Sequence, residues 1–192
     1  MRVLLNRRRG MGMADIKPKY LMTSETNPEV LAICYAQGWC ASPDHMTYEE
    51  AAAVKNIGNI MRNNGNIKHF DELEYFTSLT ACPALLYCTA LISIKLPMFA
   101  KTIQNQYLRG CSKLTTVTIP ATMTSIEMYA FHSCSVLTSV YIYATNPPTI
   151  GTGIFLNATS KLTIYVPSES VSLYKAAAGW SSYASKIKAI PS

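Results

Sequence analysis

The chain has 192 residues, of which 49% are hydrophobic and 15% are charged, so it is long and apolar enough to form one domain with a substantial core. Its net charge of +6 is dispersed outside the first twenty residues and lacks an arginine–aromatic pattern, which argues against specific nucleic-acid binding. No apolar run reaches the roughly 18 residues that a membrane span needs.

Residues 1–20 form a basic arm that carries six basic groups and one acid. The arm does not read as a secretory signal, because its apolar stretch is too short and its charges are in the wrong order. We expect it either to dock on an acidic site of a larger assembly or to fold back on its own domain. The candidate anchoring residues are Val3, Leu4, Leu5, Arg7, Arg8 and Arg9.

Residues 21–66 are predicted to form a helical module. Asn27 suits a helix N-cap, Pro28 suits the first helical position, and Gly38 suits the end of that helix. Thr47 and Glu50 have the spacing of a capping box for a second helix. The module should therefore contain two short helices that flank a loop.

That loop, residues 40–50, lies where an EF-hand-like calcium loop would sit. Such a loop needs oxygen ligands at positions 1, 3, 5 and 12 and a glycine at position 6. Here Cys40 takes the first position and His45 replaces the glycine, so that only Asp44 and Glu50 remain as strong ligands. We predict an ordinary turn, with no metal site and no cofactor.

A repeat of 23 residues follows, marked by Cys88, Cys111 and Cys134. Each unit contains L-x-x-V-x-I, in which buried and exposed positions alternate as in a strand. The second half of a unit is expected to return as a turn or as a second short strand. The period predicts a solenoid, whose apolar columns are Leu91/Leu114/Leu137, Ile94/Val117/Val140, Leu96/Ile119/Ile142, Ile103/Ile126 and Leu108/Phe131/Phe155.

These units resemble the BspA-like leucine-rich repeats, which read as an L-x-x-I-x-I-P strand followed by T-x-I-x-x-x-A-F-x-x-C. Residues 112–134 match this pattern closely, whereas residues 89–111 carry Tyr107-Leu108 in place of Ala-Phe. Residues 164–187 resemble the closing segment of such arrays. The resemblance implies a leucine-rich-repeat solenoid for adhesion or protein binding, without enzymatic activity, mostly in proteins of gut anaerobes and their mobile elements.

We therefore expect an α+β, β-rich chain with three to four units of about 23 residues. The basic arm covers residues 1–20, the helical module 21–66, the repeats 67–163 and a C-terminal cap 164–192.

The six cysteines and three histidines do not predict catalysis. Three cysteines share one column and are expected to be buried, reduced fillers; a disulfide between neighbours is the alternative. Their spacing does not match a zinc site. His132 lies two residues from Cys134, but no third group is expected to orient it. No catalytic residue is predicted.

The exposed positions of the strands are the predicted binding face. Stacking aligns equivalent positions in two rows, and two tyrosines end the second row, which suits binding, although β propensity alone also favours threonine and tyrosine. The rows are Ser93, Thr116, Ser139 and Thr163, and Lys95, Thr118, Tyr141 and Tyr165.

We predict a non-enzymatic binding protein with protein partners in a multi-subunit assembly, such as the virion of a phage of a gut bacterium. The alternative is a bacterial cell-surface adhesin that binds a host protein or glycan.

Overall fold

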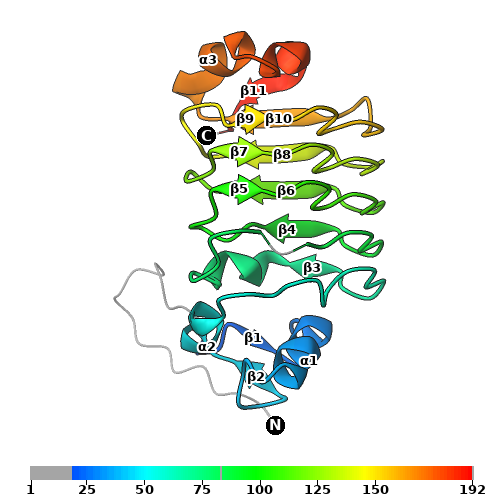
Figure 1. Cartoon of the computed structure of the whole chain (residues 1–192), viewed down its shortest axis with the longest axis vertical. Helices are drawn as coiled ribbons and strands as arrows, with labels where there is room; N and C mark the ends of the chain where they lie inside the picture. The colour runs from blue at the N-terminus through cyan, green and yellow to red at the C-terminus, as the bar shows by residue number, and fades with distance from the viewer. Residues whose placement is uncertain (1–18, 83, 192) are drawn as a thin grey trace, which may run out of the picture.

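The computed structural model describes residues 19–82 and 84–191. The six candidate anchoring residues of the basic arm lie outside this part of the chain. The described residues combine short helices with two parallel sheets, whose strands follow one another in sequence order along the long axis of the molecule (Figure 1). This arrangement is consistent with a repeat fold.

The longer sheet has six parallel strands in the order β11-β10-β8-β6-β4-β3. Its central members occur where the L-x-x-V-x-I pattern predicts them. β6 ends directly before Pro120 and β4 ends two residues before Pro97, and neither proline has an N–H to continue the pairing. The strands are β3 (His69–Phe70), β4 (Ser93–Lys95), β6 (Thr116–Ile119), β8 (Ser139–Ile142), β10 (Thr163–Val166) and β11 (Ile187–Ala189).

The second half of each unit returns as a short strand, which decides between the two alternatives for this segment. These strands form a three-stranded parallel sheet, in which β7 lies between β5 and β9. Each is two residues long: β5 (Thr102–Ile103), β7 (Ser125–Ile126) and β9 (Thr149–Ile150).

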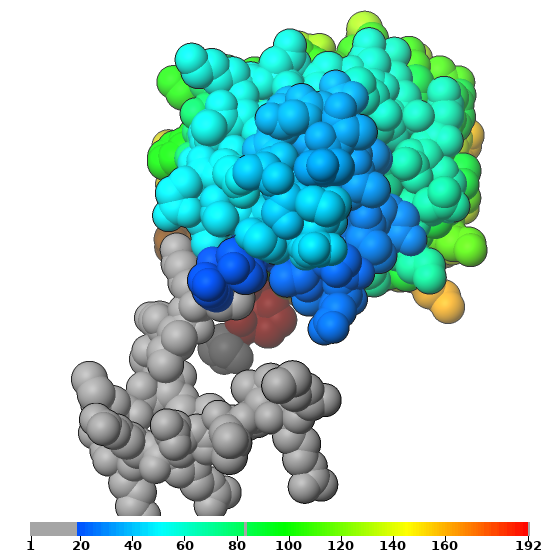
Figure 2. Space-filling model, turned by 90° about the horizontal axis from the view of Figure 1, so that it is seen from below, coloured from blue at the N-terminus to red at the C-terminus, as the bar shows by residue number. Residues whose placement is uncertain are grey.

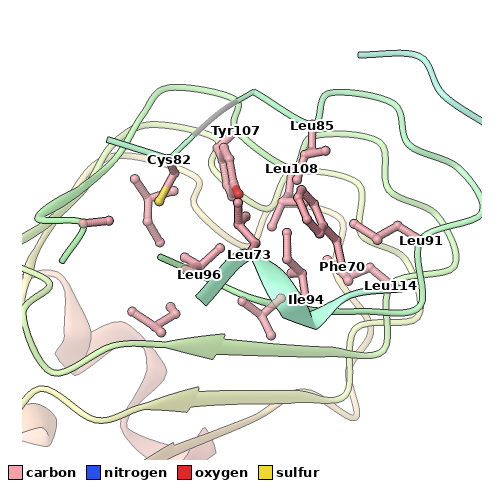
Figure 3. Close-up of a cluster of buried hydrophobic side chains, with 14 of the residues drawn as sticks. Phe70, Leu73, Cys82, Leu85, Leu91, Ile94, Leu96, Tyr107, Leu108 and Leu114 are labelled. Atoms are coloured by element: carbon pink, nitrogen blue, oxygen red, sulfur yellow. The ribbon is translucent and has the colours of Figure 1, made fainter. Parts of the chain in front are cut away.

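The five predicted apolar columns are all buried between the sheets and turns. Strand pairing places Ile94, Val117 and Val140 directly beside one another, which confirms the register assigned from the sequence. A buried side chain of this size contributes about 1.5–3 kcal/mol. Figure 3 shows part of this core, in which side chains from successive units point toward one another.

Both predicted helices of the N-terminal segment are present, as α1 (Pro28–Ala36) and α2 (Tyr48–Ala53). The sequence did not predict the two short strands that accompany these helices. β1 (Met22–Thr23) precedes α1 and pairs antiparallel with β2 (His45–Met46), which lies between α1 and α2. Seen from this end, these residues cover the first units of the stack (Figure 2). The first strand of the six-stranded sheet, β3, is thus covered on this side.

The capping prediction is right for one helix and wrong for the other. Thr47 and Glu50 form the complete capping box of α2. Asn27 occupies the N-cap position of α1, but its side chain does not cap the helix. Its buried amide instead donates to the carbonyl of His69 at 3.1 Å and to Glu72 Oε2 at 2.9 Å. Asn27 therefore ties α1 to the first unit.

Glu50 has a second role in the loop that was compared with a calcium site. Its Oε2 accepts the N–H of Thr47 and its Oε1 accepts the N–H of Ala41, both at 2.8 Å. These backbone hydrogen bonds lower the pKa of Glu50 despite the opposing effect of its partial desolvation by burial. The carboxylate thus holds the loop closed.

The C-terminal residues cover the other end of the stack (Figure 1). Two side chains fix them: the Tyr174 hydroxyl donates to the carbonyl of Ala144 at 2.8 Å, and Trp180 Nε1 donates to that of Pro148 at 2.7 Å. The short helices here are η2 (Ser168–Ser170), α3 (Val171–Ala176) and η3 (Trp180–Lys186), and a further one, η1 (Asp71–Tyr75), follows β3.

The cysteine column is more than apolar filling. All six cysteines are buried and free. The thiols of Cys88, Cys111 and Cys134 donate to the carbonyls of Met61, Leu85 and Leu108, 26 or 27 residues earlier, at sulfur–oxygen distances of 3.0, 3.3 and 3.2 Å. Each thiol therefore links its unit to the preceding one, which requires it to stay protonated.

We expect all six thiols to titrate as free after denaturation without reductant. We also expect the free energy of unfolding to fall at high pH. Burial raises the pKa of Cys88 to about 11 and that of Cys134 to about 12, from an ordinary value of 9.0. Because the folded pKa is the higher one, the stabilisation is fully present below about pH 9 and is lost as the pH rises through about 11–12. Urea denaturation across this range measures the loss, which Cys134→Ala should reduce. A Cys88–Cys111 or Cys111–Cys134 bridge found by mass spectrometry would contradict this account.

The departure at Tyr107-Leu108 from the Ala-Phe pair of the next unit has a structural compensation. Tyr107 replaces Ala130 and Leu108 replaces Phe131, so a larger side chain at one position accompanies a smaller one at the next. Figure 3 shows Tyr107 between Cys82 and Leu108, pointing inward. Its hydroxyl is buried and has no hydrogen-bond partner among the described residues.

Tyr107→Phe is expected to raise the free energy of unfolding by about 1 kcal/mol, because it removes a buried hydroxyl that makes no hydrogen bond. Tyr174→Phe is the matched control, since it removes a buried hydroxyl that does make one. The control should lower the free energy of unfolding by about 1–3 kcal/mol. Changes of the same sign in thermal denaturation would show that the two hydroxyls are in equivalent surroundings.

Candidate functional site

The exposed face of the six-stranded sheet carries the side chains singled out from the sequence. Cα pairing places them in two straight rows, as expected. All eight are half-buried, so they are held by their neighbours and still reach solvent. The first row is Ser93, Thr116, Ser139 and Thr163, and the second is Lys95, Thr118, Tyr141 and Tyr165.

Each row continues by one residue that the sequence reasoning missed. His69 of β3 pairs with Ser93, and Lys188 of β11 pairs with Tyr165. Neither β3 nor β11 shows the full L-x-x-V-x-I pattern, so no periodic signal identified them.

The rings of Tyr141 and Tyr165 stack on one another, with centroids 4.8 Å apart and an interplanar angle of 13°. Neighbouring parallel strands lie about 4.8 Å apart, so the stacking follows directly from identical side chains in register. The pair forms a rigid aromatic surface with two hydroxyl groups. Such a surface loses little conformational entropy when a partner binds.

A pocket of about 300 Å³ opens beside the second row, at the ends of β4 and β6. Thr118 is the small member of that row between Lys95 and Tyr141, and it lines the pocket. The remaining lining is largely apolar and comprises Leu96, Met98, Pro120, Ala121 and Tyr143, with Lys95 and Glu74 at the edge. Tyr143 lies two positions after Tyr141, so the strand periodicity could have identified it.

An ion pair closes one side of this pocket. Lys95 Nζ lies 2.9 Å from Glu74 Oε1, and both side chains are partly exposed. The hydrogen bond to Glu74 raises the pKa of Lys95, so the lysine is charged at any physiological pH. The edge of an otherwise apolar pocket thus presents a cation and a carboxylate side by side.

The end of the first row beside β3 contains a polar cluster that the spacing of residues in the sequence did not reveal. The hydroxyl of Ser93 donates to Asp71 Oδ2 at 3.1 Å and lies 2.9 Å from Nδ1 of His69. These residues are 22 and 24 positions from Ser93, so only the register between β3 and β4 brings them together.

This serine, histidine and aspartate are not connected as in a hydrolytic triad. In a triad the histidine lies between the other two and accepts the serine proton. Here the serine lies in the middle and its hydroxyl donates a hydrogen bond to the carboxylate, so the hydrogen bond with His69 uses an imidazole N–H as the donor. The arrangement holds three polar groups in place on the face and does not activate the hydroxyl.

The other two histidines pack against aromatic rings. The ring of His45 lies tilted against that of Tyr20, with centroids 3.9 Å apart and an interplanar angle of 33°, and His132 meets Tyr129 edge-on at 5.6 Å. Within residues 19–82 and 84–191, no three His, Cys, Asp or Glu side chains are grouped so as to hold a metal ion. No helix in this part of the chain is both long and apolar enough to cross a bilayer.

Parallel strands stacked at a period of 23 or 24 residues, buried leucine columns and exposed rows of side chains define a leucine-rich-repeat protein. A family model for the BspA type leucine rich repeat region matches residues 55–183 with six copies, and the chain belongs to this family. No curated protein matches the chain.

The family model counts more copies than the three to four units expected from the sequence. The matched range begins at residue 55 and ends at residue 183, so it includes segments that depart strongly from the L-x-x-V-x-I pattern. Membership of this family indicates a protein-binding or adhesion module, and the family is in general non-enzymatic.

Proposed function

We propose that this chain is a leucine-rich-repeat solenoid that binds a protein partner through the exposed face of its six-stranded sheet. In this proposal residues 67–163 are the binding unit, residues 21–66 a helical module and residues 164–192 a cap. The observation that carries the proposal is the stacked Tyr141–Tyr165 pair next to the apolar pocket on the same rows.

The chemistry of the pocket favours a protein ligand. An apolar side chain of the partner fits between Met98, Pro120 and Tyr143, where it displaces water from apolar surface. Lys95 and Glu74 at the edge supply a donor and an acceptor for the backbone or for a charged neighbour of that side chain. Tyrosines beside such a pocket are typical of binding hot spots.

A peptide selected from a random library against the full chain tests the proposal. We expect selected peptides to combine a bulky apolar residue with a charged neighbour. The double variant Tyr141→Ala, Tyr165→Ala should weaken binding of such a peptide by about 2 kcal/mol or more, measured by isothermal titration calorimetry. Tyr35→Ala is the matched control, because Tyr35 is an exposed tyrosine on α1, away from the rows.

Unchanged affinity of the double variant for every selected peptide would overturn the proposal. Circular dichroism of both variants distinguishes a lost binding surface from a lost fold. A loss of affinity in a variant whose circular dichroism spectrum is unchanged is therefore a loss of the binding surface.

We also propose that the module is a component of a larger particle, such as a phage virion, held by its N-terminal arm. The support is the charge of the arm, where Arg7, Arg8 and Arg9 are adjacent and follow a short apolar stretch. Several such contacts are needed, since one exposed ion pair contributes only about 0–1 kcal/mol. Display on a bacterial cell surface, with a host protein or glycan as ligand, is the alternative.

A further inference from the structure

A second cleft lies away from the sheet face, where the chain after α2 meets the first units. It has a volume of about 320 Å³, at the small end of the range for ligand pockets of about 300–1,000 Å³. Lys55, Asn56, Asn59 and Arg62 line it from the N-terminal side, and Gln104 and Asn105 line it from the unit that contains β5.

The cleft exists because the intervening unit carries short side chains. Ala81 bridges to Thr102, so Ala81 and Cys82 lie one unit before Thr102 and Ile103. Ala81, Cys82 and Ala84 line the cleft from this unit, whereas the next unit presents Gln104 and Asn105. Short side chains between longer polar side chains on both sides leave a hollow whose base includes apolar groups.

The charge of the cleft is opposite to the net charge of residues 21–88, which supply most of its lining. Residues 21–88 contain eight acids and three bases, yet two of these bases, Lys55 and Arg62, line the cleft. No acidic residue of the described chain lines it. Neither base forms an ion pair within the described residues, where the sole salt bridge joins Lys95 and Glu74. Both cations are therefore available to an anionic ligand.

The amides give the cleft a second type of contact. Asn56, Asn59, Gln104 and Asn105 each carry both donors and an acceptor, as a ligand with several hydroxyl groups requires. Asn56 Oδ1 accepts the N–H of Gly58 at 2.8 Å, which fixes this side chain and leaves its NH₂ group as a donor. The lining is thus more polar than that of the pocket on the sheet face.

We propose that this cleft binds an acidic sugar, that is, a monosaccharide unit with a carboxylate. The carboxylate pairs with Arg62 and Lys55, because a guanidinium group matches carboxylate geometry with two parallel hydrogen bonds. The hydroxyls bond to the surrounding amides, and the C–H face of the ring rests on the alanines of the base. This site is independent of the protein-binding face.

Titration of the full chain with methyl β-D-glucuronide, followed by two-dimensional amide NMR, tests this proposal. We expect saturable shifts of residues around the cleft, such as Gly58 and Asn105, at millimolar concentration. Methyl β-D-glucoside, which has the same ring without the carboxylate, should bind about tenfold more weakly. Arg62→Gln should weaken glucuronide binding by a similar factor, and Lys113→Gln, at an exposed lysine that does not line the cleft, should leave it unchanged.

Three outcomes would overturn the proposal. Equal shifts with sodium acetate and with glucuronide would define a general anion site, which does not recognise a sugar. Undiminished glucuronide binding in the Lys55→Gln, Arg62→Gln double variant would place the ligand elsewhere. Lack of shifts with glucuronide, galacturonate and N-acetylneuraminate alike would exclude an acidic sugar. Because the substituted side chains are exposed, amide spectra of the free variants verify that the fold is intact.

Discussion

Trp180→Ala is expected to lower the free energy of unfolding by about 3–5 kcal/mol and to detach the C-terminal cap. The indole is completely buried and meets the ring of Tyr174 edge-on, with centroids 5.2 Å apart. Its N–H donates to Pro148 in the loop before β9. Truncation therefore leaves a cavity, removes an aromatic pair and leaves a buried carbonyl without its donor.

Leu173→Ala provides the control for this substitution. Leu173 lies next to Tyr174 on α3, but 49% of its surface is exposed, so its truncation should change stability by about 0.5 kcal/mol or less. Chemical denaturation measures the free energy of unfolding of both variants. It is monitored by the circular dichroism of the backbone, because that signal does not depend on the tryptophan that one variant lacks. Similar losses for Trp180→Ala and Leu173→Ala would mean that the cap does not depend on the buried indole.

Phe131→Ala is expected to have an effect of the same size, about 3–5 kcal/mol, at the centre of the stack. Phe131 is completely buried and stacks on Phe155 of the next unit, with centroids 5.4 Å apart and an interplanar angle of 15°. Phe155 in turn meets Tyr183 of the cap edge-on at 5.4 Å. The substitution thus loosens the contact between two units and weakens the support of the cap.

Thr118→Ala is the control in this case, because Thr118 lies on an exposed row of the same repeat. Its effect should stay within about 0.5 kcal/mol. Urea denaturation of the two variants compares a column that faces the core with a row that faces solvent. Equal midpoints and equal slopes would show that the buried and exposed positions of the repeat have been assigned to the wrong faces.

The sequence predicts the parts of the fold that repeat. A buried column such as Leu91, Leu114 and Leu137 follows from its 23-residue spacing, because one register places every member at once. The same spacing predicts the two exposed rows. It cannot decide whether a two-residue return segment such as Ser125–Ile126 pairs as a strand, since so short a segment has no periodicity of its own.

The parts that do not repeat could not be predicted in this way. Asn27 has the residue type and the position of an N-cap, but tertiary contacts with His69 and Glu72, more than 40 residues away, take its side chain instead. The cluster around Ser93 depends on the register of β3, whose unit departs from the pattern. The polar cleft depends on the short side chains of Ala81, Cys82 and Ala84, which have no signal as a binding site until their neighbours are in place.

Hydroxyl-radical footprinting of the tyrosines, with and without a selected peptide, tests most directly whether the sheet face is the binding surface. The chain carries 12 tyrosines, and their side-chain oxidation is measured by mass spectrometry. We predict that the peptide protects Tyr141, Tyr143 and Tyr165 while oxidation of Tyr35 and Tyr87, which belong to neither the rows nor the pocket, stays unchanged. Protection of Tyr35 or Tyr87, with Tyr141 and Tyr165 oxidised as in the free chain, would contradict the assignment of this face.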